Sequence, residues 1–170
     1  ADFLDVTYIS LGDWGNWQQE ELLQFQQIYP KIKLTILEKK FKKEFLKYVL
    51  LYKLPYFFKT NSIDISSYIL RKNFREIAEE GKFDYIIMSY ASWGKLVFDL
   101  KHKSYNILDT HDFITAQKRN KPNIIGRNFQ DEMQILNQFD EIWTYSIEEK
   151  YIFEQFTPAK VTMIPVSFPL

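Results

Sequence analysis

The apolar and polar positions along the chain predict strands that alternate with helices. Short apolar runs rich in β-branched and aromatic residues are typical of strands, and the segments between them have the composition of helices. The predicted strands are residues 5–10, 33–38, 83–89, 105–109, 139–145 and 160–165. The predicted helices are residues 18–29, 67–80, 129–138 and 148–156, with a further short helix between residues 89 and 105.

Two less regular stretches and one cap complete this pattern. Residues 41–70 are expected to be mostly helical, with breaks near Pro55 and at residues 60–62. Gly81 is expected to cap the helix that precedes it, because glycine accepts the left-handed conformation of a helix end. Residues 119–128 are polar and contain Pro122 and Gly126, so they are predicted to form a loop.

Strands that alternate with helices imply a mainly parallel sheet with helices on both faces. We therefore expect a Rossmann-like, doubly wound α/β domain that covers residues 1–165. In such domains, ligands bind outside the carboxyl ends of the strands, near the switch in strand order. The polar residues that follow the strands are therefore the candidate functional residues.

The composition describes one folded domain and disfavours several classes of function. The 170 residues are 46% hydrophobic and 26% charged, which is enough for a single α/β core. Lysine plus arginine and aspartate plus glutamate number 22 each, so no overall basic field favours nucleic acid. The absence of cysteine excludes disulfides, cysteine-ligated zinc and a cysteine nucleophile. No run is apolar enough to cross a bilayer, and a cytoplasmic protein is the expectation.

Polar side chains and turn glycines follow four of the predicted strands. They are Gly12 and Gly15 after the first strand, Tyr90 and Ser92 after the third, Asp109, Thr110, His111 and Asp112 at the end of the fourth, and Ser146 and Glu149 after the fifth. Histidine is the side chain that can change its charge near neutral pH, and carboxylates beside it would favour the charged form. In a cleft it could donate a hydrogen bond to a sugar hydroxyl, a phosphate or a departing oxygen. The alternative is that Asp109 or Asp112 caps the next helix and His111 packs beside it.

Other kinds of site are disfavoured by the sequence. Residues 109–112 offer oxygen and nitrogen ligands, but no second histidine cluster completes a metal site, so no metal is expected. The G-x-S-x-G pattern of serine hydrolases and the P-loop pattern are both absent. The turn with Gly12 and Gly15 could bring backbone amides close to a phosphate, although an ordinary strand-to-helix turn is the favoured interpretation.

Residues 39–59 combine seven lysines with one acidic residue, Glu44, and with many aromatic side chains. One face of a helix would carry Phe41, Phe45, Tyr48, Val49 and Tyr52. A core-facing helix with solvated lysines explains this pattern. The sharper alternative is a basic aromatic surface that attaches the protein to an anionic acceptor or to the inner face of a membrane.

Several motifs follow one another in a characteristic order in the second half of the chain. They are FDYII from Phe83, ILDTHD from Ile107, Glu132 with Leu136, FDEIW from Phe139, SIEE from Ser146 and VTMIP from Val161. In this order they resemble the N-terminal domain of GT-B fold glycosyltransferases, the retaining group that uses nucleotide sugars. The resemblance covers residues 83–165 and is looser before them.

This resemblance implies a hexosyltransferase built from two Rossmann-like domains that face each other across a cleft. The N-terminal domain holds a glycan or lipid-linked acceptor, and a C-terminal domain beyond the linker at residues 166–170 holds a UDP- or GDP-sugar. Either His111 or Asp112 would reach the transferred sugar. Tyr90, Ser92, Asp109 and Thr110 would contact substrate, as would Ser146 and Glu149 of the Ser-x-x-Glu pattern. The N-terminal domain alone would be inactive, and transfer would need no metal held by the protein.

Alternatives stay open for the position of the first strand and for the function. Residues 2–9 resemble the second strand of such a domain, with the first strand and its glycine loop absent. If residues 5–10 are instead the first strand, Gly12 and Gly15 form that loop. A sugar-nucleotide 2-epimerase shares the two-domain architecture. A non-catalytic Rossmann-like module could bind a partner protein or a membrane through residues 39–59.

Overall fold

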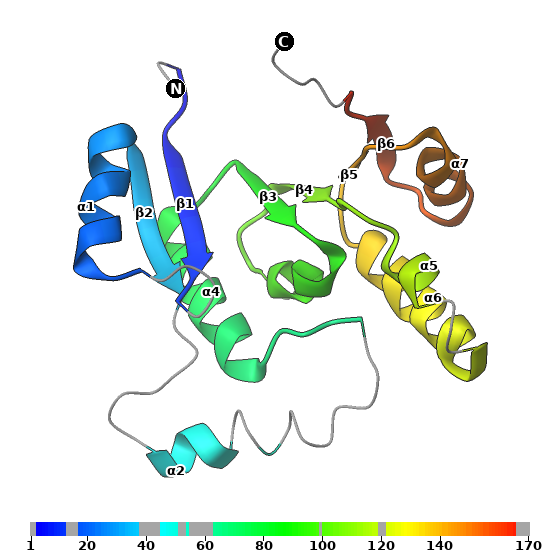
Figure 1. Ribbon diagram of the computed structural model, residues 1–170, viewed down its shortest axis with the longest axis horizontal. Coiled ribbons are helices and arrows are strands. Elements are labelled where there is room, and N and C mark those ends of the chain that lie inside the picture. The colour runs from blue at the N-terminus through cyan, green and yellow to red at the C-terminus, as the bar shows by residue number, and fades with distance from the viewer. Residues whose placement is uncertain are drawn as a thin grey trace.

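The chain folds into an α/β structure whose strands are all parallel and form two small sheets (Figure 1). The computed structural model describes residues 3–12, 17–37, 45–50, 54, 63–98, 100–118 and 122–165. Strand β1 (Val6–Leu11) pairs with β2 (Ile32–Leu37). The second sheet has the order β3 (Tyr85–Ser89), β4 (Tyr105–Asp109), β5 (Glu141–Thr144) and β6 (Lys160–Met163). The six predicted strands are thus confirmed, but they form two sheets and not one.

Helices connect the strands, as predicted for an alternating α/β chain. They are α1 (Gln19–Ile28), α2 (Phe45–Tyr48), α4 (Tyr68–Gly81), the 3₁₀ helix η2 (Ala91–Val97), α5 (Ile114–Gln117), α6 (Pro122–Leu136) and α7 (Ile147–Phe156). The Ser67 hydroxyl accepts the Leu70 N–H at the start of α4, and the Ser146 hydroxyl accepts the Glu149 N–H at the start of α7. Each serine satisfies one of the free donors of a first helical turn.

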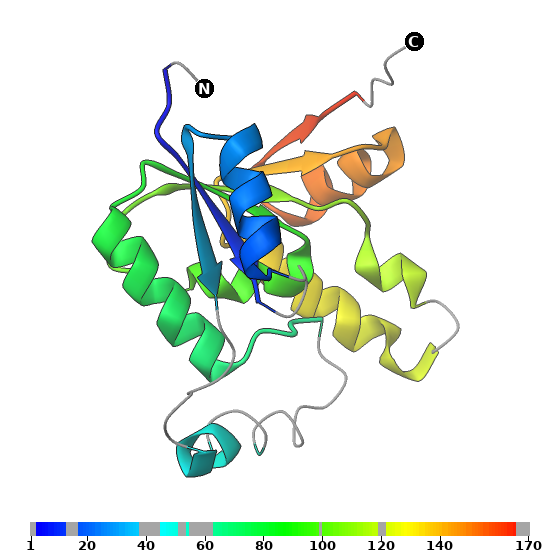
Figure 2. The same ribbon diagram turned by 60° about the vertical axis from the view of Figure 1, so that its left-hand side comes forward.

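The core lies between the strands and the helices drawn beneath them, α4, η2 and α6 (Figure 2). Leu108 of β4 and Ile142 of β5 are fully buried, as are Ile135 and Leu136 of α6. Burial of such a side chain stabilises the fold by about 1.5–3 kcal/mol. This packing fixes the carboxyl ends of β3, β4 and β5, where the candidate residues lie.

The loop predicted for residues 119–128 is wrong, because α6 begins at Pro122. Proline suits the first position of a helix, where its missing N–H has no partner to lose and its fixed φ is already helical. Gly126 lies in the exposed part of this helix. The polar composition of the segment therefore reflects a solvated helix face.

The predicted cap at Gly81 is also wrong, since Gly81 is the last residue of α4 and Lys82 takes the left-handed conformation with φ of 45°. Position 81 carries glycine because a side chain there would have no space. A Cβ atom at Gly81 would lie 2.5 Å from the ring of Phe83. The glycine therefore lets the ring of Phe83 fold back against the end of the helix.

Half of the predicted helical region at residues 41–70, and most of the lysine-aromatic segment at residues 39–59, lies outside the described residues. Within the described part, α2 and the start of α4 are helical, as predicted. Residues 63–66 are not helical. The buried carboxylate of Asp64 accepts the Ser66 N–H at 2.9 Å and forms an ion pair with Arg71 at 2.6 Å. An aspartate that binds the backbone two residues further on favours a turn over a helix. In the parts of the chain that the structure describes, no helix combines the length and apolar character needed to span a membrane.

Candidate functional site

Four side chains meet at the carboxyl ends of three neighbouring strands and form what we name the strand-end cluster. Tyr90 follows β3, Asp109 and His111 lie at the end of β4, and Tyr145 follows β5. Parallel strands that lie side by side end at the same edge of the sheet. The order β3-β4-β5 therefore brings residues from distant parts of the sequence together.

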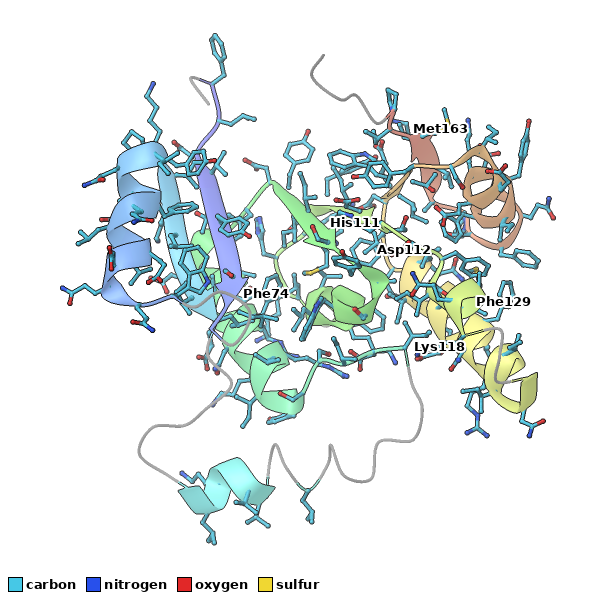
Figure 3. The ribbon with its side chains drawn as sticks, in the orientation of Figure 1. Phe74, His111, Asp112, Lys118, Phe129 and Met163 are labelled. Carbon is cyan, nitrogen blue, oxygen red and sulfur yellow. The ribbon has the colours of Figure 1, made fainter. Side chains whose placement is uncertain are left out.

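His111 is held on three sides and open on the remaining one. Its Nε2 lies 3.0 Å from Oδ2 of Asp109, and its ring stacks on Tyr90 with the centroids 4.4 Å apart and the planes inclined by 17°. Tyr145 lies on another side, with its ring centroid 5.6 Å away. The side chain of His111 is 38% exposed, whereas that of Asp109 is 14% exposed. Figure 3 shows where His111 and Asp112 lie in the molecule.

The contact with Asp109 decides which nitrogen of His111 can meet a ligand. A proton on Nε2 donates to the Asp109 carboxylate, so Nδ1 is the nitrogen left for other partners. In the neutral ring Nδ1 accepts a hydrogen bond, and in the charged ring it donates one. The arrangement can therefore bind a hydroxyl group, or stabilise an oxygen that carries negative charge.

The backbone of the strand-end cluster is strained at two places. Tyr90 has φ of 68° and His111 has φ of 56°. Such values cost a residue with a side chain about 1–3 kcal/mol, and they persist where the surrounding structure enforces them. Strain of this kind is concentrated at functional sites, so two strained residues whose rings stack on each other mark this edge of the sheet.

Two carboxylates hold the backbone that follows His111. Glu149 accepts the Phe113 N–H at 3.0 Å and the Thr144 hydroxyl at 2.6 Å. Glu132 accepts the Ile114 N–H at 2.9 Å, and it accepts both the N–H and the hydroxyl of Thr115 at 2.8 and 2.6 Å. Both glutamates lie on helices, so they tie the start of α5 to α7 and to α6.

Burial shifts the pKa of two groups in this region. Burial raises the pKa of Glu132 above its usual value, although the hydrogen bonds from Thr115 and Ile114 oppose the shift. The pKa of the Tyr145 hydroxyl is raised above 10.0 by partial burial, then by its hydrogen bond with Asp109 and by the charge of that carboxylate. Tyr145 therefore stays protonated at neutral pH and presents an O–H group to the strand-end cluster.

The structure brings three of the candidate residues, Tyr90, Asp109 and His111, together, and their contact with substrate stays a prediction. Asp112 is exposed, and its N–H donates to the Thr110 carbonyl at 2.6 Å. Thr110 is buried, and its hydroxyl donates to the Trp143 carbonyl at 2.9 Å. Its hydroxyl therefore joins β4 to β5, and a contact with substrate stays a prediction.

Other predicted site residues have structural partners. The Ser92 carbonyl accepts the Ile65 N–H, and the Gly12 N–H donates to the Leu37 carbonyl and so extends the β1–β2 ladder. Ser146 caps α7 and Glu149 holds Phe113, so their roles in substrate binding also stay predictions. Gly15 lies outside the described residues.

Tyr145 is the member of the strand-end cluster that the sequence analysis did not select. Its place directly after a predicted strand was the available signal. Sequence alone does not tell on which side of the sheet this side chain turns after the strand ends, and the Ser-x-x-Glu pattern that predicts Ser146 does not include Tyr145.

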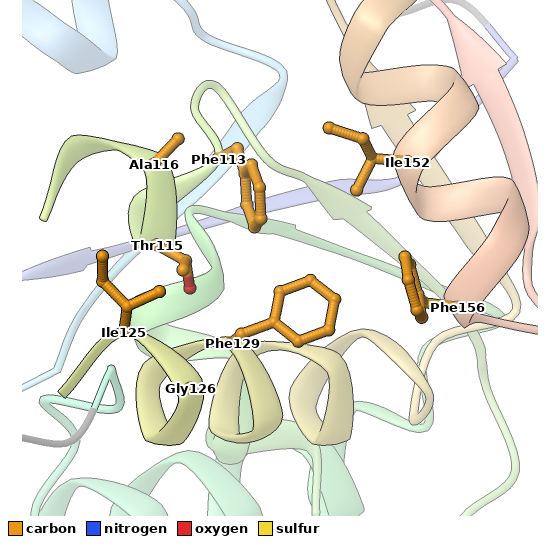
Figure 4. A pocket seen from close by; sticks show the side chains of 8 residues that line it. All are labelled: Phe113, Thr115, Ala116, Ile125, Gly126, Phe129, Ile152 and Phe156. Atoms are coloured by element: carbon orange, nitrogen blue, oxygen red, sulfur yellow. The ribbon is translucent and has the colours of Figure 1, made fainter. Parts of the chain in front are cut away.

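An apolar groove lies beside this region, between α5, α6 and α7 (Figure 4). It has a volume of about 600 Å³, and Phe113, Phe129 and Phe156 line it together with Ile125 and Ile152. Phe129 makes edge-to-face contacts with Phe113 and Phe156, with centroid distances of 6.1 and 4.9 Å. Because Phe113 is two residues from His111, the groove begins close to the strand-end cluster.

Within the residues that the structure describes, no group of three or more histidine, aspartate or glutamate side chains is placed to hold a metal ion. The side chains of the strand-end cluster supply an imidazole, a carboxylate and two phenols. Comparison with known proteins adds no relative, because no family model, no curated protein and no solved structure matches the chain.

Proposed function

We propose that the chain is the acceptor-side domain of a glycosyltransferase with GT-B architecture that uses a nucleotide sugar. One observation carries this proposal, namely that His111 is oriented by Asp109 and Tyr90 at the carboxyl ends of three parallel strands. This is the edge at which open α/β domains bind ligands. The motifs from Phe83 to Pro165 that resemble such domains support the same function.

In the proposed reaction, the bond between the anomeric carbon and the phosphate oxygen of the donor breaks, and a bond to the acceptor oxygen forms. The nucleotide departs with the electron pair of the broken bond, and its phosphate oxygen takes the proton that the acceptor hydroxyl loses. His111 binds the transferred sugar through Nδ1 while Asp109 holds its Nε2–H. A ring fixed in this way needs no reorientation as charge develops on the sugar. A second, donor-binding domain supplies the UDP- or GDP-sugar.

Of the two acceptor classes that the sequence analysis left open, the groove beside Phe113 favours the lipid-linked one. Its lining is apolar along its length, so it suits an alkyl or isoprenoid chain better than a second sugar. A lipid chain in this groove would leave the acceptor head group close to His111. Short-chain acceptors that fail to fill the groove should therefore show a higher KM with the same kcat.

The test is turnover of the complete two-domain protein with His111→Ala and Asp109→Asn. Each change removes one part of the oriented imidazole, and we expect transfer to fall by about 100-fold or more in both variants. His102→Ala is the matched control, because this other histidine lies outside the strand-end cluster, and it should retain activity. Circular dichroism checks that the variants fold. Normal turnover of a folded His111→Ala protein would remove His111 from the mechanism, and release of free epimerised sugar without acceptor would favour an epimerase.

A further inference from the structure

Strands β1 and β3 each have one edge that pairs with no other strand in the described residues. In the described residues, β1 pairs only with β2, and β3 pairs only with β4. Across Figure 1 the strands follow in the order β2, β1, β3, β4, β5 and β6. The unpaired edge of β1 therefore lies on the side of β3, between the two sheets.

The hydrogen bonds identify which amides point into this interval. The Gly12 N–H donates to the Leu37 carbonyl, and alternate residues of a parallel strand bond to the same neighbour. The N–H groups of Tyr8 and Ser10 therefore face β2. Those of Ile9 and Leu11, with that of Thr7, point away from β2.

The same alternation applies to β3. The Tyr90 N–H donates to the Asp109 carbonyl, and the Asp84 carbonyl accepts the Tyr105 N–H. The even-numbered residues of β3 therefore bond to β4, and the N–H groups of Tyr85, Ile87 and Ser89 point away from it. Two rows of backbone donors and acceptors thus border the interval between the sheets.

These inner edges lack the features that protect a free edge. Proteins block exposed edges with lysine, other charges or proline, because a bare edge pairs with other strands. The outer strands β2 and β6 carry Lys33 and Lys160, respectively, whereas the sequences of β1, VTYISL, and β3, YIIMS, contain no charge and no proline. The inner edges are therefore suited to pairing with a strand.

The face of β3 that points away from the core is uncovered. Ile86 and Met88 are buried in the core with α4 and η2, whereas Tyr85 and Ile87 are 64% and 55% exposed. Central strands of parallel sheets are covered on both faces by helices. A helix that would cover Tyr85 and Ile87 is missing from the described structure.

We propose that a β-strand inserts between β1 and β3, parallel to both, and that the helix after it covers Tyr85 and Ile87. The strand would join the two sheets into one, and its backbone would satisfy both open rows. Its source is the polypeptide directly N-terminal to residue 1 in the intact protein. This strand-and-helix partner follows from the unpaired edges and the uncovered face.

The connection rules identify this source. Successive parallel strands lie next to each other, with right-handed crossovers. A strand that precedes β1 along the chain therefore takes the edge of β1 opposite β2, and its helix lies on the face that carries α1. Tyr8 marks that face, because it stacks on Phe25 of α1 with the ring centroids 5.9 Å apart. Ile9 and Leu11 pack against the core on the other face, as do Ile86 and Met88.

The same insertion would complete the surroundings of the strand-end cluster. The carboxyl end of the inserted strand would lie between Gly12 and Tyr90, since all strands run in the same direction. The turn after it would border the ring of Tyr90 that stacks on His111. The N-terminal polypeptide would thus contribute backbone amides to this site, whatever reaction the site performs.

Amide hydrogen exchange, resolved by residue with NMR, tests the insertion on residues 1–170 and on the intact protein. In residues 1–170 we expect the amides of Ile9 and Ile87 to exchange much faster than those of Ser10 and Met88, which bond to β2 and β4. In the intact protein Ile9 and Ile87 should slow by at least about tenfold, while Ser10 and Met88 remain slow. Ile9 and Ile87 amides that stay fast in the intact protein would overturn the proposal.

Two further results would distinguish the proposed strand and helix from other partners of β1 and β3. Protection of Ile9 and Ile87 in residues 1–170 that rises with protein concentration would indicate a second copy of the chain and would overturn the assignment to the N-terminal polypeptide. The substitution Ile87→Lys should lower the Tm of the intact protein but leave residues 1–170 nearly unchanged. The control is Ile147→Lys, at an isoleucine that is 44% exposed, and it should change the Tm of the intact protein and of residues 1–170 by the same amount. Equal effects of Ile87→Lys on both proteins would contradict a covering helix.

Discussion

Glu132 couples the stability of the fold to pH, and its replacement tests how the backbone after His111 is held. The side chain is 1% exposed and accepts three hydrogen bonds, from the Ile114 N–H and from the N–H and hydroxyl of Thr115. Glu132→Ala removes all three acceptor contacts at once. Glu132→Gln keeps the shape but removes the titrating group, and it turns an NH₂ group towards one of the backbone donors.

The magnitude for Glu132→Ala follows from the donors that it leaves unpaired. Each buried N–H without a partner costs about 1–3 kcal/mol, and two are left, at Ile114 and Thr115. Removal of a buried carboxylate offsets part of this cost, because its raised pKa means that the fold disfavours the charged form. We therefore expect the free energy of unfolding to fall by about 2–4 kcal/mol at pH 7.

The pH dependence has a definite sign. The pKa of Glu132 is raised in the folded state above its ordinary value of 4.5, so the folded protein binds this proton more tightly than the unfolded chain does. The stability that this proton contributes is present below pH 4.5 and is lost as the pH rises through the folded pKa. Glutamine does not titrate. The stability of Glu132→Gln relative to the parent protein should therefore increase between pH 4.5 and pH 7.

Urea unfolding, followed by tryptophan fluorescence at several pH values between 4 and 8, measures both effects. Glu80→Gln is the control, because Glu80 is an exposed glutamate of α4, and it should stay within about 0.5 kcal/mol of the parent protein at each pH. A difference between Glu132→Gln and the parent protein that is constant over this range, or that decreases with pH, would refute the assignment of a raised pKa. A stable Glu132→Ala variant would show that the three hydrogen bonds do not hold α5.

Three core and helix positions give further predictions for the same urea assay. Gly94→Ala should destabilise the protein by about 1–3 kcal/mol, because a Cβ atom there would overlap the buried side chain of Ile135. Gly126→Ala should stabilise it by about 0.5–1 kcal/mol, because a Cβ atom meets nothing within 4 Å and alanine favours the helix; equal effects of the two substitutions would contradict this reasoning. Asn128→Leu should increase the free energy of unfolding, because the fully buried amide of Asn128 has no hydrogen-bond partner among the described residues, and a loss of stability would reveal a partner for it.

The strands of this fold could be predicted from the sequence because each has a local signature. The runs at Ile107 and Ile142 contain β-branched and other apolar residues, and Ile107, Leu108 and Ile142 are buried in the structure. Helix ends were less predictable. Pro122 and Gly126 have the same local preference in a loop and at the start of α6, and only the packing of that helix against the core decides between them.

The candidate site could be predicted only in part, because its geometry depends on contacts between strands. The sequence placed Asp109 and His111 after one strand and Tyr90 after another. It did not reveal that the ring of His111 stacks on Tyr90 or that both residues have a positive φ. Asparagine, aspartate and histidine adopt a positive φ more often than other residues with side chains, but this preference is too weak to predict it at His111, and Tyr90 has no such preference. The two positive φ values follow from tertiary contacts that the local sequence does not encode.

The glutamates of this region show why acidic residues near a strand end cannot be assigned a role from sequence. Glu149 and Glu132 both belong to the motifs that resemble a glycosyltransferase domain, yet their oxygens accept hydrogen bonds from Phe113, Ile114 and Thr115. These bonds fix the backbone immediately after the strained residue His111, which would otherwise relax at a gain of about 1–3 kcal/mol. One or two such bonds are enough to hold that strain, since each is worth about 1.5–3 kcal/mol when the acceptor is charged. The carboxylates therefore act on the candidate site through the backbone, and Asp109 is the acid that contacts the imidazole itself.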